Sequence, residues 1–224
     1  SEEQSASGHG ITILDPIRVR QLNIKGIKEA WAVRGTPADC VKLAVQELAK
    51  KECSLVISGI NNGPNLGTDV LYSGTVSAAI EGAILGIPSM AVSLGEYDYY
   101  EYETAAEIAL VLAKKLYLNR YSIPPDTLLN VNVPAVTKDR IRGFKVTKLG
   151  VREYENVFDR RMDPRGNIYY WLKGEVVPAR NHDIETDAVA VEEGYVSVSP
   201  IQFDLTNYRV INTVKDCGFE DVSV

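Results

Sequence analysis

The chain has 224 residues, of which 45% are hydrophobic, so it can bury the core of one large α/β domain. Its net charge of −6 argues against binding to duplex nucleic acid, because such a protein needs a basic surface to meet the phosphates. Three widely spaced cysteines, no signal peptide and no apolar run of about 18 residues predict a reduced, cytoplasmic protein without a membrane span.

The first segments of the chain are predicted to hold a loop and weak strands. Residues 1–10 are polar and rich in small side chains, which is typical of a loop. Pro16 interrupts the apolar segment 11–19, so this segment is at best an edge strand or a broken strand. A further short strand is expected within residues 24–33.

A helix is predicted from Thr36 to about Lys51. Thr36 can cap its first turn, and Pro37 suits the first helical position because its missing N–H has no partner there anyway. Asp39 interacts favourably with the positive end of the helix dipole. The helix start is therefore one of the clearest signals in the sequence.

The middle of the chain alternates between strands and helices. The predicted order is strand 54–58, loop 59–67, helix 73–85, strand 88–94, helix 100–117 and strand 127–133. The strand at 54–58 is a continuous apolar run, which is typical of a fully buried strand in a parallel sheet. This alternation predicts βαβ units and an α/β fold whose parallel sheet is covered on both faces.

The pattern changes after residue 143. Strands are predicted at 143–149 and 167–172, with a protruding hairpin between them, followed by helix 187–193, strand 195–201 and helix 206–215. The hairpin carries Arg152, Arg160, Arg161 and Arg165. These arginines could bind a phosphate or the carboxylates of a partner, or they could line a solvated surface.

The loop at residues 59–67 is the first candidate for chemistry. Open parallel sheets bind ligands beyond the carboxyl ends of their strands, and this loop follows such an end. Asn61, Asn62 and Asn65 offer neutral oxygens to a cation or N–H groups to a phosphate. A tight turn that needs glycine and asparagine is the alternative explanation.

Ser73, Gly74 and Thr75 open the next predicted helix. Free N–H groups, the helix dipole and two hydroxyls make such a start a candidate site for an anion. An ordinary serine cap explains the same residues.

A second loop of small residues contains Ser5, Ser7 and His9. His9 could act as a general acid or base, but the composition of this loop favours a flexible chain end, and a single histidine does not decide between the two.

Several other classes of protein are excluded by missing motifs. The sequence has no Gly-x-x-x-x-Gly-Lys-Ser/Thr of a P-loop NTPase and no Gly-x-Ser-x-Gly of an α/β-hydrolase. No Gly-x-Gly-x-x-Gly follows a strand, which weakens a dinucleotide-dependent dehydrogenase. Two histidines are too few for a zinc site built from histidines.

A long, ordered set of motifs resembles the SurE family. The motifs are residues 58–67 (Ser-Gly-Ile-Asn-Asn-Gly-Pro-Asn-Leu-Gly), 72–79 (Tyr-Ser-Gly-Thr-Val-Ser-Ala-Ala), 81–82, 35–41, 130–134, 163–166, 169–171, 186–187 and 194–200. The resemblance covers nearly the whole chain. It implies a Rossmann-like three-layer α/β/α sandwich with a mostly parallel sheet, a protruding hairpin and a C-terminal segment exchanged between subunits. It also implies a single domain over residues 1–224, with residues 1–135 as the Rossmann-like core and residues 136–224 as the hairpin, late strand and oligomerisation segment.

The resemblance implies a metal-dependent phosphatase that hydrolyses nucleoside 5′- and 3′-monophosphates, with one Mg²⁺ or Mn²⁺ per subunit, in a homodimer or homotetramer. Some family members also hydrolyse short polyphosphate. By their positions in the motifs, Ser5 and Asn61 are the implied metal ligands. Asn65, Ser73, Gly74 and Thr75 are the implied phosphate-binding residues, and Asn61, Ser73 and Thr75 are expected to carry the catalysis.

The family's opening strand, which carries two adjacent aspartates, has no counterpart in these residues. Ser5 and Asn61 alone would offer only neutral oxygens, a weak site for Mg²⁺ or Mn²⁺. The alternative function is therefore a catalytically inactive module for nucleotide binding or oligomerisation. A nicotinamide-dependent oxidoreductase is a third hypothesis, which rests on analogy of fold alone.

Overall fold

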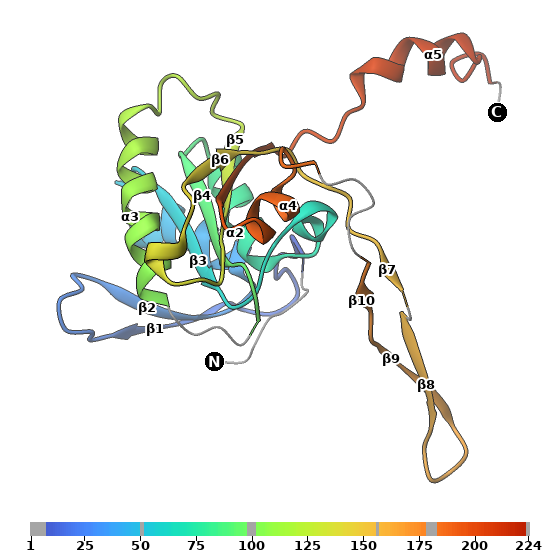
Figure 1. The fold of residues 1–224 in the computed structure, drawn as a ribbon, viewed down its shortest axis with the longest axis horizontal. Helices are drawn as coiled ribbons and strands as arrows, with labels where there is room; N and C mark the ends of the chain where they lie inside the picture. Colours follow the sequence, from blue (N-terminus) through green and yellow to red (C-terminus); the bar gives the residue numbers. More distant parts are fainter. Residues whose placement is uncertain (1–7, 50–51, 98–101, 156, 178–182, 223–224) are drawn as a thin grey trace.

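The computed structural model describes residues 8–49, 52–97, 102–155, 157–177 and 183–222. Its centre is a five-stranded sheet in the order β3-β4-β5-β11-β6 (Figure 1). The strands are β3 (Val56–Asn61), β4 (Ser89–Leu94), β5 (Thr127–Val133), β11 (Val196–Gln202) and β6 (Phe144–Val146). β3, β4 and β5 are parallel to one another, β11 is antiparallel to β5, and β6 is parallel to β11. The sheet is therefore mostly parallel, as the alternating sequence pattern predicts.

Helices cover both faces of this sheet and complete a three-layer α/β/α sandwich (Figure 1). α3 (Tyr102–Leu118) packs on one face and α2 (Gly74–Ile84) on the other, while α1 (Pro37–Leu43) packs on α2 and α4 (Asp187–Glu192) packs on β11. Short helical segments lie at η1 (Ala44–Leu48), η2 (Gly67–Leu71), η3 (Lys138–Arg140) and η4 (Tyr208–Val210).

Strand β4 shows how the sequence builds the layers. All six of its residues are buried, because β4 lies between two strands and under a helix on each face. Met90, Val92 and Leu94 pack with the apolar side of α3, and Ala91 packs with the small residues of α2. The alternating direction of side chains along a strand sorts these residues to the two faces. The small residues of α2 allow that helix to approach the sheet closely.

Helix α1 begins as the sequence predicts. Thr36 and Asp39 form a reciprocal capping box, with the Asp39 N–H donated to Thr36 Oγ1 (3.1 Å) and the Thr36 N–H donated to Asp39 Oδ2 (2.8 Å). Pro37 takes the first helical position. The predicted single helix to about Lys51 changes pitch instead, because the chain continues as the π-helical segment η1. Lys51 itself lies outside the described residues.

The expectation of a fully buried strand at residues 54–58 is wrong. β3 starts at Val56, and Ile57 is 48% exposed. In the described part of the sheet, β3 pairs with β4 alone, so it is an edge strand and only one of its long sides is covered. β3 also continues to Asn61, three residues into the segment predicted as a loop. A continuous apolar run predicts burial by neighbours, but it does not say how many neighbours the strand has.

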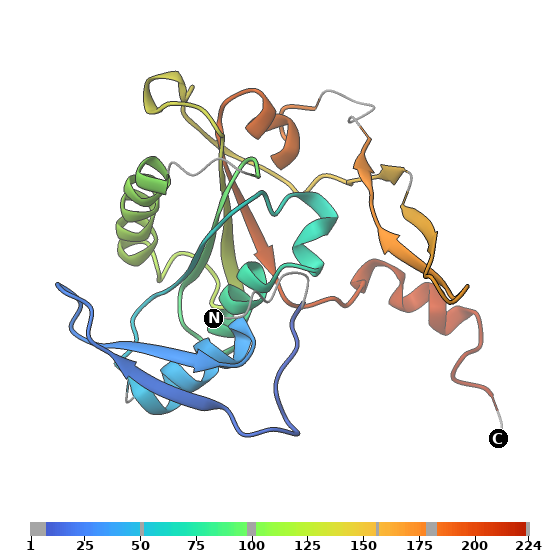
Figure 2. The same cartoon turned by 90° about the horizontal axis from the view of Figure 1, so that it is seen from below.

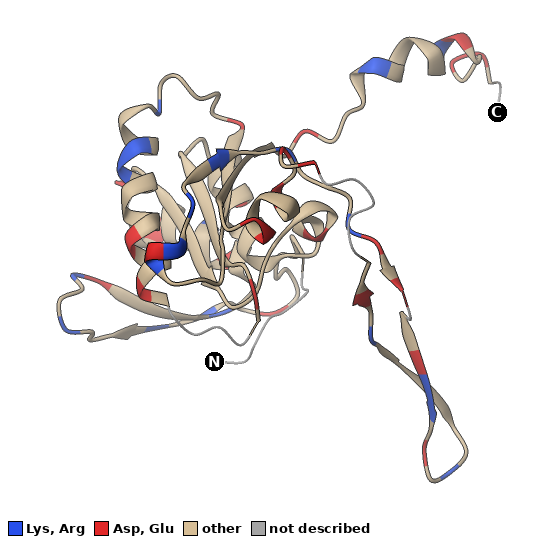
Figure 3. Ribbon diagram, viewed as in Figure 1, with Lys and Arg blue, Asp and Glu red and all other residues tan. Residues whose placement is uncertain are grey.

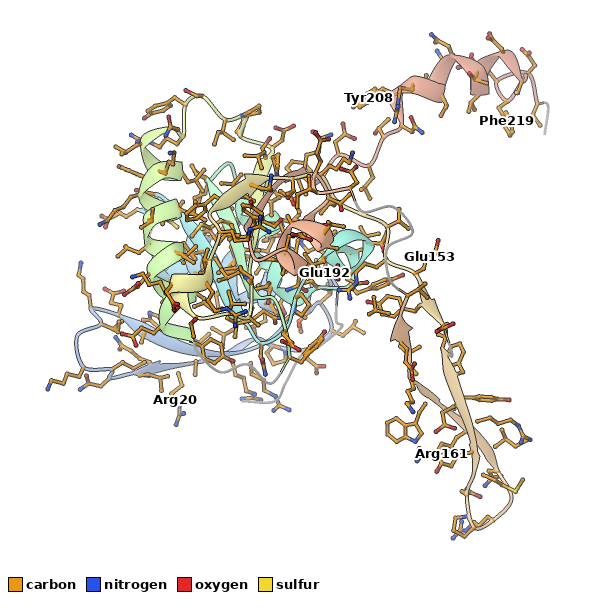
Figure 4. All side chains as sticks on the ribbon, viewed as in Figure 1. Arg20, Glu153, Arg161, Glu192, Tyr208 and Phe219 are labelled. Carbon is orange, nitrogen blue, oxygen red and sulfur yellow. The ribbon has the colours of Figure 1, made fainter. Side chains whose placement is uncertain are left out.

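Two antiparallel arms and one helix extend from the body. The first arm is formed by β1 (Arg18–Leu22) and β2 (Ala30–Arg34). The second, the hairpin arm, has the pair β7 (Tyr154–Glu155) and β10 (Glu175–Val176) at its base and the pair β8 (Phe158–Met162) and β9 (Ile168–Leu172) beyond it. The β8–β9 arm and the C-terminal helix α5 (Ile211–Asp216) leave the body on the same side (Figure 2). Figure 4 shows Arg161 on this arm, and Tyr208 and Phe219 on the C-terminal segment, far from the sheet.

Charged residues of both signs are interspersed over the ribbon (Figure 3). None of the helices in the described part of the chain is both long and apolar enough to cross a membrane.

Candidate functional site

The start of α2 presents a set of hydrogen-bond donors at the carboxyl edge of the parallel strands. Ser73 is the N-cap, and its Oγ accepts the N–H of Val76 (3.1 Å). Helix geometry leaves the N–H groups of Gly74 and Thr75 without an acceptor inside the helix. A hydroxyl that accepts one bond can still donate its own proton, so Ser73 adds a possible O–H donor. These groups can bind an anion.

Asn61 lies at the end of β3 and contacts this helix start. Its Oδ1 accepts the hydroxyl of Thr75 (3.1 Å), and its Nδ2 donates to the carbonyl oxygen of Gly63 (2.9 Å). The two bonds orient the amide, and they leave one lone pair of Oδ1 for a further partner. Asn61 and Thr75 are thus brought together across 14 positions of sequence. Asn62, which is the neighbouring candidate ligand in the same loop, is exposed.

Asn65 occupies a different environment. It is buried, and its Nδ2 donates to Ser93 Oγ (2.7 Å) at the end of β4. Its backbone N–H donates to Asn132 Oδ1 (2.9 Å), and its carbonyl accepts from the amides of Asn130 and Asn132. Asn65 therefore anchors the loop to strands β4 and β5. A contact between Asn65 and phosphate stays a prediction.

The loop at residues 8–12 lies along α1 and α2. The Gly8 N–H donates to the carbonyl of Tyr72 (3.1 Å), next to the N-cap of α2. The N–H and hydroxyl of Thr12 both donate to the carboxylate of Asp39. These bonds hold this loop against the start of each helix. Ser5, the other implied metal ligand, lies outside the described residues.

Glu81 is a buried carboxylate of α2 that contacts both α1 and the N-terminal loop. Its side chain is 4% exposed and accepts from Lys42 Nζ (2.7 Å) and His9 Nε2 (3.0 Å), which come from α1 and from the N-terminal loop. Burial by itself would raise the pKa of Glu81, but the bonds and charges of Lys42 and His9 hold it below its ordinary value. The sequence analysis assigned Glu81 no role. Its place in the motif at residues 81–82, among the small residues of α2, is the signal that could have identified it.

Asp187 is a second buried carboxylate, and it belongs to the motif at residues 186–187, from which no chemical role was predicted. It is fully buried, and it accepts the N–H groups of Gly67 (2.7 Å), Gly150 (2.9 Å) and Ala188 (2.9 Å). Gly67 is the last residue of the asparagine-rich loop, and Gly150 precedes the hairpin arm. Asp187 therefore joins α4, the loop and the base of the arm.

The base of the arm also contacts η2. The Tyr154 hydroxyl donates to Asp69 Oδ2, and Arg152 Nη1 lies 3.5 Å from the same oxygen. Burial and this hydrogen bond raise the pKa of Tyr154 to about 12. Further along the arm, Arg161 pairs with Asp159 (2.8 Å). Two of the arginines predicted for the hairpin therefore lie in different environments. Arg152 contacts Asp69 of η2, whereas Arg161 is paired with Asp159 within β8.

The described residues do not form a complete site for a divalent cation. Within these residues, no group of three or more His, Cys, Asp or Glu side chains could hold a metal ion. The buried carboxylates of the described residues are engaged by other partners. Thr12 and Thr36 donate to Asp39, and Lys42 and His9 pair with Glu81. Asp187 accepts the N–H groups of Gly67 and Gly150. Asn61 offers one neutral oxygen, whereas Mg²⁺ usually takes at least one carboxylate.

The fold and the edge of the sheet define a three-layer α/β protein with a donor-rich helix start beyond the carboxyl ends of its parallel strands. The sequence model described as "Survival protein SurE" matches residues 1–156. The chain therefore belongs to the SurE family.

Relatives support the same assignment along nearly the full chain. The protein named 5'-nucleotidase SurE from Heliobacterium modesticaldum is 54% identical over 219 residues, which are 96% of this chain and 78% of the relative. The protein of the same name from Natranaerobius thermophilus is 51% identical over 224 residues, 98% of this chain and 85% of the relative. The crystal structure of the SurE protein from Aquifex aeolicus has a TM-score of 0.81 and 42% identity, and the match covers 96% of this chain and 84% of that one.

Proposed function

We propose that this protein is a phosphatase that hydrolyses nucleoside 5′-monophosphates, and also 3′-monophosphates, to nucleoside and phosphate. The observation that carries the proposal is the contact between Asn61 and Thr75, which joins the end of β3 to the donor-rich start of α2. Relatives about 50% identical over nearly the full chain bear the name 5'-nucleotidase SurE, which supports the same reaction.

The phosphate would bind at the start of α2. The N–H groups of Gly74 and Thr75 and the hydroxyl of Ser73 would donate to its oxygens, and the helix dipole would favour its negative charge. The same fixed donors would stabilise the charge that builds on these oxygens as the ester bond breaks. Asn61 would hold Thr75 in place for this role.

A divalent cation, Mg²⁺ or Mn²⁺, belongs to the proposal, with Ser5 and Asn61 contributing ligands. The family resemblance supports this requirement. A homodimeric or homotetrameric assembly, a cytoplasmic location and a single domain over residues 1–224 are proposals on the same ground. The alternative of a catalytically inactive module finds no support in the relatives.

The deciding experiment measures phosphate release from 5′-AMP and 3′-AMP with Mn²⁺ or Mg²⁺, and then with excess EDTA. Release from 5′-AMP that EDTA abolishes and added Mn²⁺ restores is the expected result. Phosphate release that EDTA leaves unchanged would overturn the cation requirement, but the proposed phosphatase activity would stand. If neither substrate releases phosphate with any cation, the proposed activity is wrong.

A further inference from the structure

The ring of Tyr97 lies directly on the asparagine-rich loop. A Cβ atom added to Gly63 would stand 2.2 Å from Cε1 and 2.4 Å from Cδ1 of this ring, so only glycine allows the contact. Gly63 also has a φ of +102°, which favours glycine. Gly63 is buried, yet Tyr97 remains 66% exposed. One part of the ring is thus backed by the loop, and the rest is open to solvent.

This contact places the ring close to the proposed phosphate site. The carbonyl oxygen of Gly63 accepts from Asn61 Nδ2 (2.9 Å), and Asn61 Oδ1 accepts from Thr75 at the start of α2. The ring, the candidate ligand and the helix start are therefore linked by consecutive contacts. A nucleotide whose phosphate binds at α2 extends its sugar and base away from the helix start, and this loop is a surface that lies beside that start.

Tyr97 also lies within electrostatic range of Tyr154 at the base of the hairpin arm. Burial and the hydrogen bond to Asp69 raise the pKa of Tyr154 to about 12, and the nearby Tyr97 contributes to the same rise. The guanidinium of Arg152 lies 5.9 Å from the centre of the Tyr154 ring. Aromatic and guanidinium groups are the side chains on which nucleobases stack.

We propose that Tyr97 is the residue on which the nucleobase of the substrate stacks, and that it thereby sets the preference for nucleotides over other phosphate esters. This inference rests on the proposed function. Its chemistry suits purines and pyrimidines alike, because every base presents a π-face. The backing by Gly63 holds the ring in place before the substrate arrives, so little freedom is lost on binding.

The test compares two substrates that differ in the base alone. KM and kcat are measured for 5′-AMP and for ribose 5-phosphate, with the intact protein and its Tyr97→Ala and Tyr97→Phe variants. Tyr97→Ala is expected to raise KM for 5′-AMP about tenfold with little change in kcat, and to leave KM for ribose 5-phosphate unchanged. Tyr97→Phe keeps the ring and should behave as the wild type does.

Two further tyrosines serve as comparisons. Tyr121 is 88% exposed and lies between α3 and the amino end of β5, whereas the candidate site lies at the carboxyl ends of the parallel strands. Tyr121→Ala should therefore change KM and kcat for neither substrate. Tyr72 is 65% exposed and precedes the N-cap Ser73, which makes it the rival platform. A loss confined to 5′-AMP in Tyr72→Ala rather than in Tyr97→Ala would overturn the assignment.

Equal effects of Tyr97→Ala on both substrates, or no effect on either, would also overturn it. These results are distinct from a failure of the proposed function, in which the wild type releases phosphate from neither substrate. That outcome would remove the assignment together with the activity on which it rests.

Discussion

At the scale of single residues, the candidate site is built from short polar side chains with defined partners. Asn61 and Thr75 bond to each other, whereas Asn65 is turned inward to Ser93. Two asparagines from one loop motif therefore have different roles. Asn61 has an oxygen lone pair for a ligand, and Asn65 secures the loop to the sheet.

Asn61→Ala is expected to lower kcat/KM for 5′-AMP by about 100-fold, because it removes the proposed ligand oxygen and the partner of Thr75 together. Steady-state kinetics at saturating Mn²⁺ would measure this loss. Asn62→Ala is the matched control, since Asn62 is the exposed neighbour, and its kcat/KM should stay near the wild-type value. A loss of similar size in Asn62→Ala would refute the assignment of Asn61.

Glu81→Gln is expected to reduce the free energy of unfolding at pH 7 by about 1–3 kcal/mol, because the ionised carboxylate that Lys42 and His9 contact becomes a neutral amide. The pKa of Glu81 is lowered in the folded protein, so the stabilisation is fully present above the ordinary pKa of 4.5. It is lost as the pH falls through the folded pKa. Urea unfolding at pH 7 and pH 3 should therefore show a difference between variant and wild type that shrinks at the lower pH.

The control for this prediction is Glu107→Gln, because Glu107 pairs with Lys138 on the surface, where both side chains are at least half exposed. Its effect on stability should stay below about 1 kcal/mol at pH 7. A difference for Glu81→Gln that is equally large at both pH values would show that shape, rather than charge, is responsible.

At the scale of elements, the position of the asparagine-rich loop depends on α4. Asp187 at the start of α4 accepts the N–H groups of Gly67 and Gly150, which stand 120 and 37 positions away along the chain. Bonds of this range fix the end of the loop and the base of the hairpin arm to the same point. The elements around the site are held together by side chains that do not belong to the site.

Asp187→Ala is expected to cost on the order of 3 kcal/mol of stability, because it leaves buried N–H groups without an acceptor. Hydrogen exchange should show faster exchange at the amide of Gly67, and urea unfolding would give the loss in stability. Asp187→Asn keeps one carbonyl oxygen and should lose less. Unchanged exchange at Gly67 in Asp187→Ala would contradict the role of this carboxylate as the anchor of the loop.

At the scale of the whole molecule, the chain exposes apolar side chains beyond its body. Leu205, Tyr208 and Phe219 in the C-terminal segment are 84%, 67% and 70% exposed. Figure 4 shows Tyr208 and Phe219 away from the body. Apolar surface of this kind is typical of a region that another protein surface covers. This agrees with the proposal that the C-terminal segment is exchanged between subunits.

If the protein is the proposed oligomer, ending the chain after Phe203, just beyond β11, is therefore expected to convert it to a monomer. Multi-angle light scattering of the purified protein would measure the mass before and after truncation. The substitution Lys215→Ala in α5 removes a charge but no apolar surface, so it should leave the mass unchanged. A truncated protein with an undiminished oligomeric mass would contradict the role of this segment.

Local signals in the sequence predicted much of the fold. The start of α1 follows from Thr36 and Pro37, and the cap of α2 follows from Ser73. β5 spans the same residues, 127–133, that its apolar run predicts. Caps and apolar runs act over a few neighbouring residues, so they can be read without the tertiary structure. The edge position of β3 could not be predicted, because it depends on which strands lie beside it.

The sequence by itself determined the family, the α/β architecture and the segments from which the candidate site is made. Only the tertiary structure decided which side chains meet, because the sheet brings strand and helix ends together from distant positions. It joined Asn61 to Thr75, turned Asn65 to Ser93 and gave Glu81 its partners His9 and Lys42. A motif states which residues are present, but burial and geometry decide whether an amide faces a ligand or supports the loop that holds it.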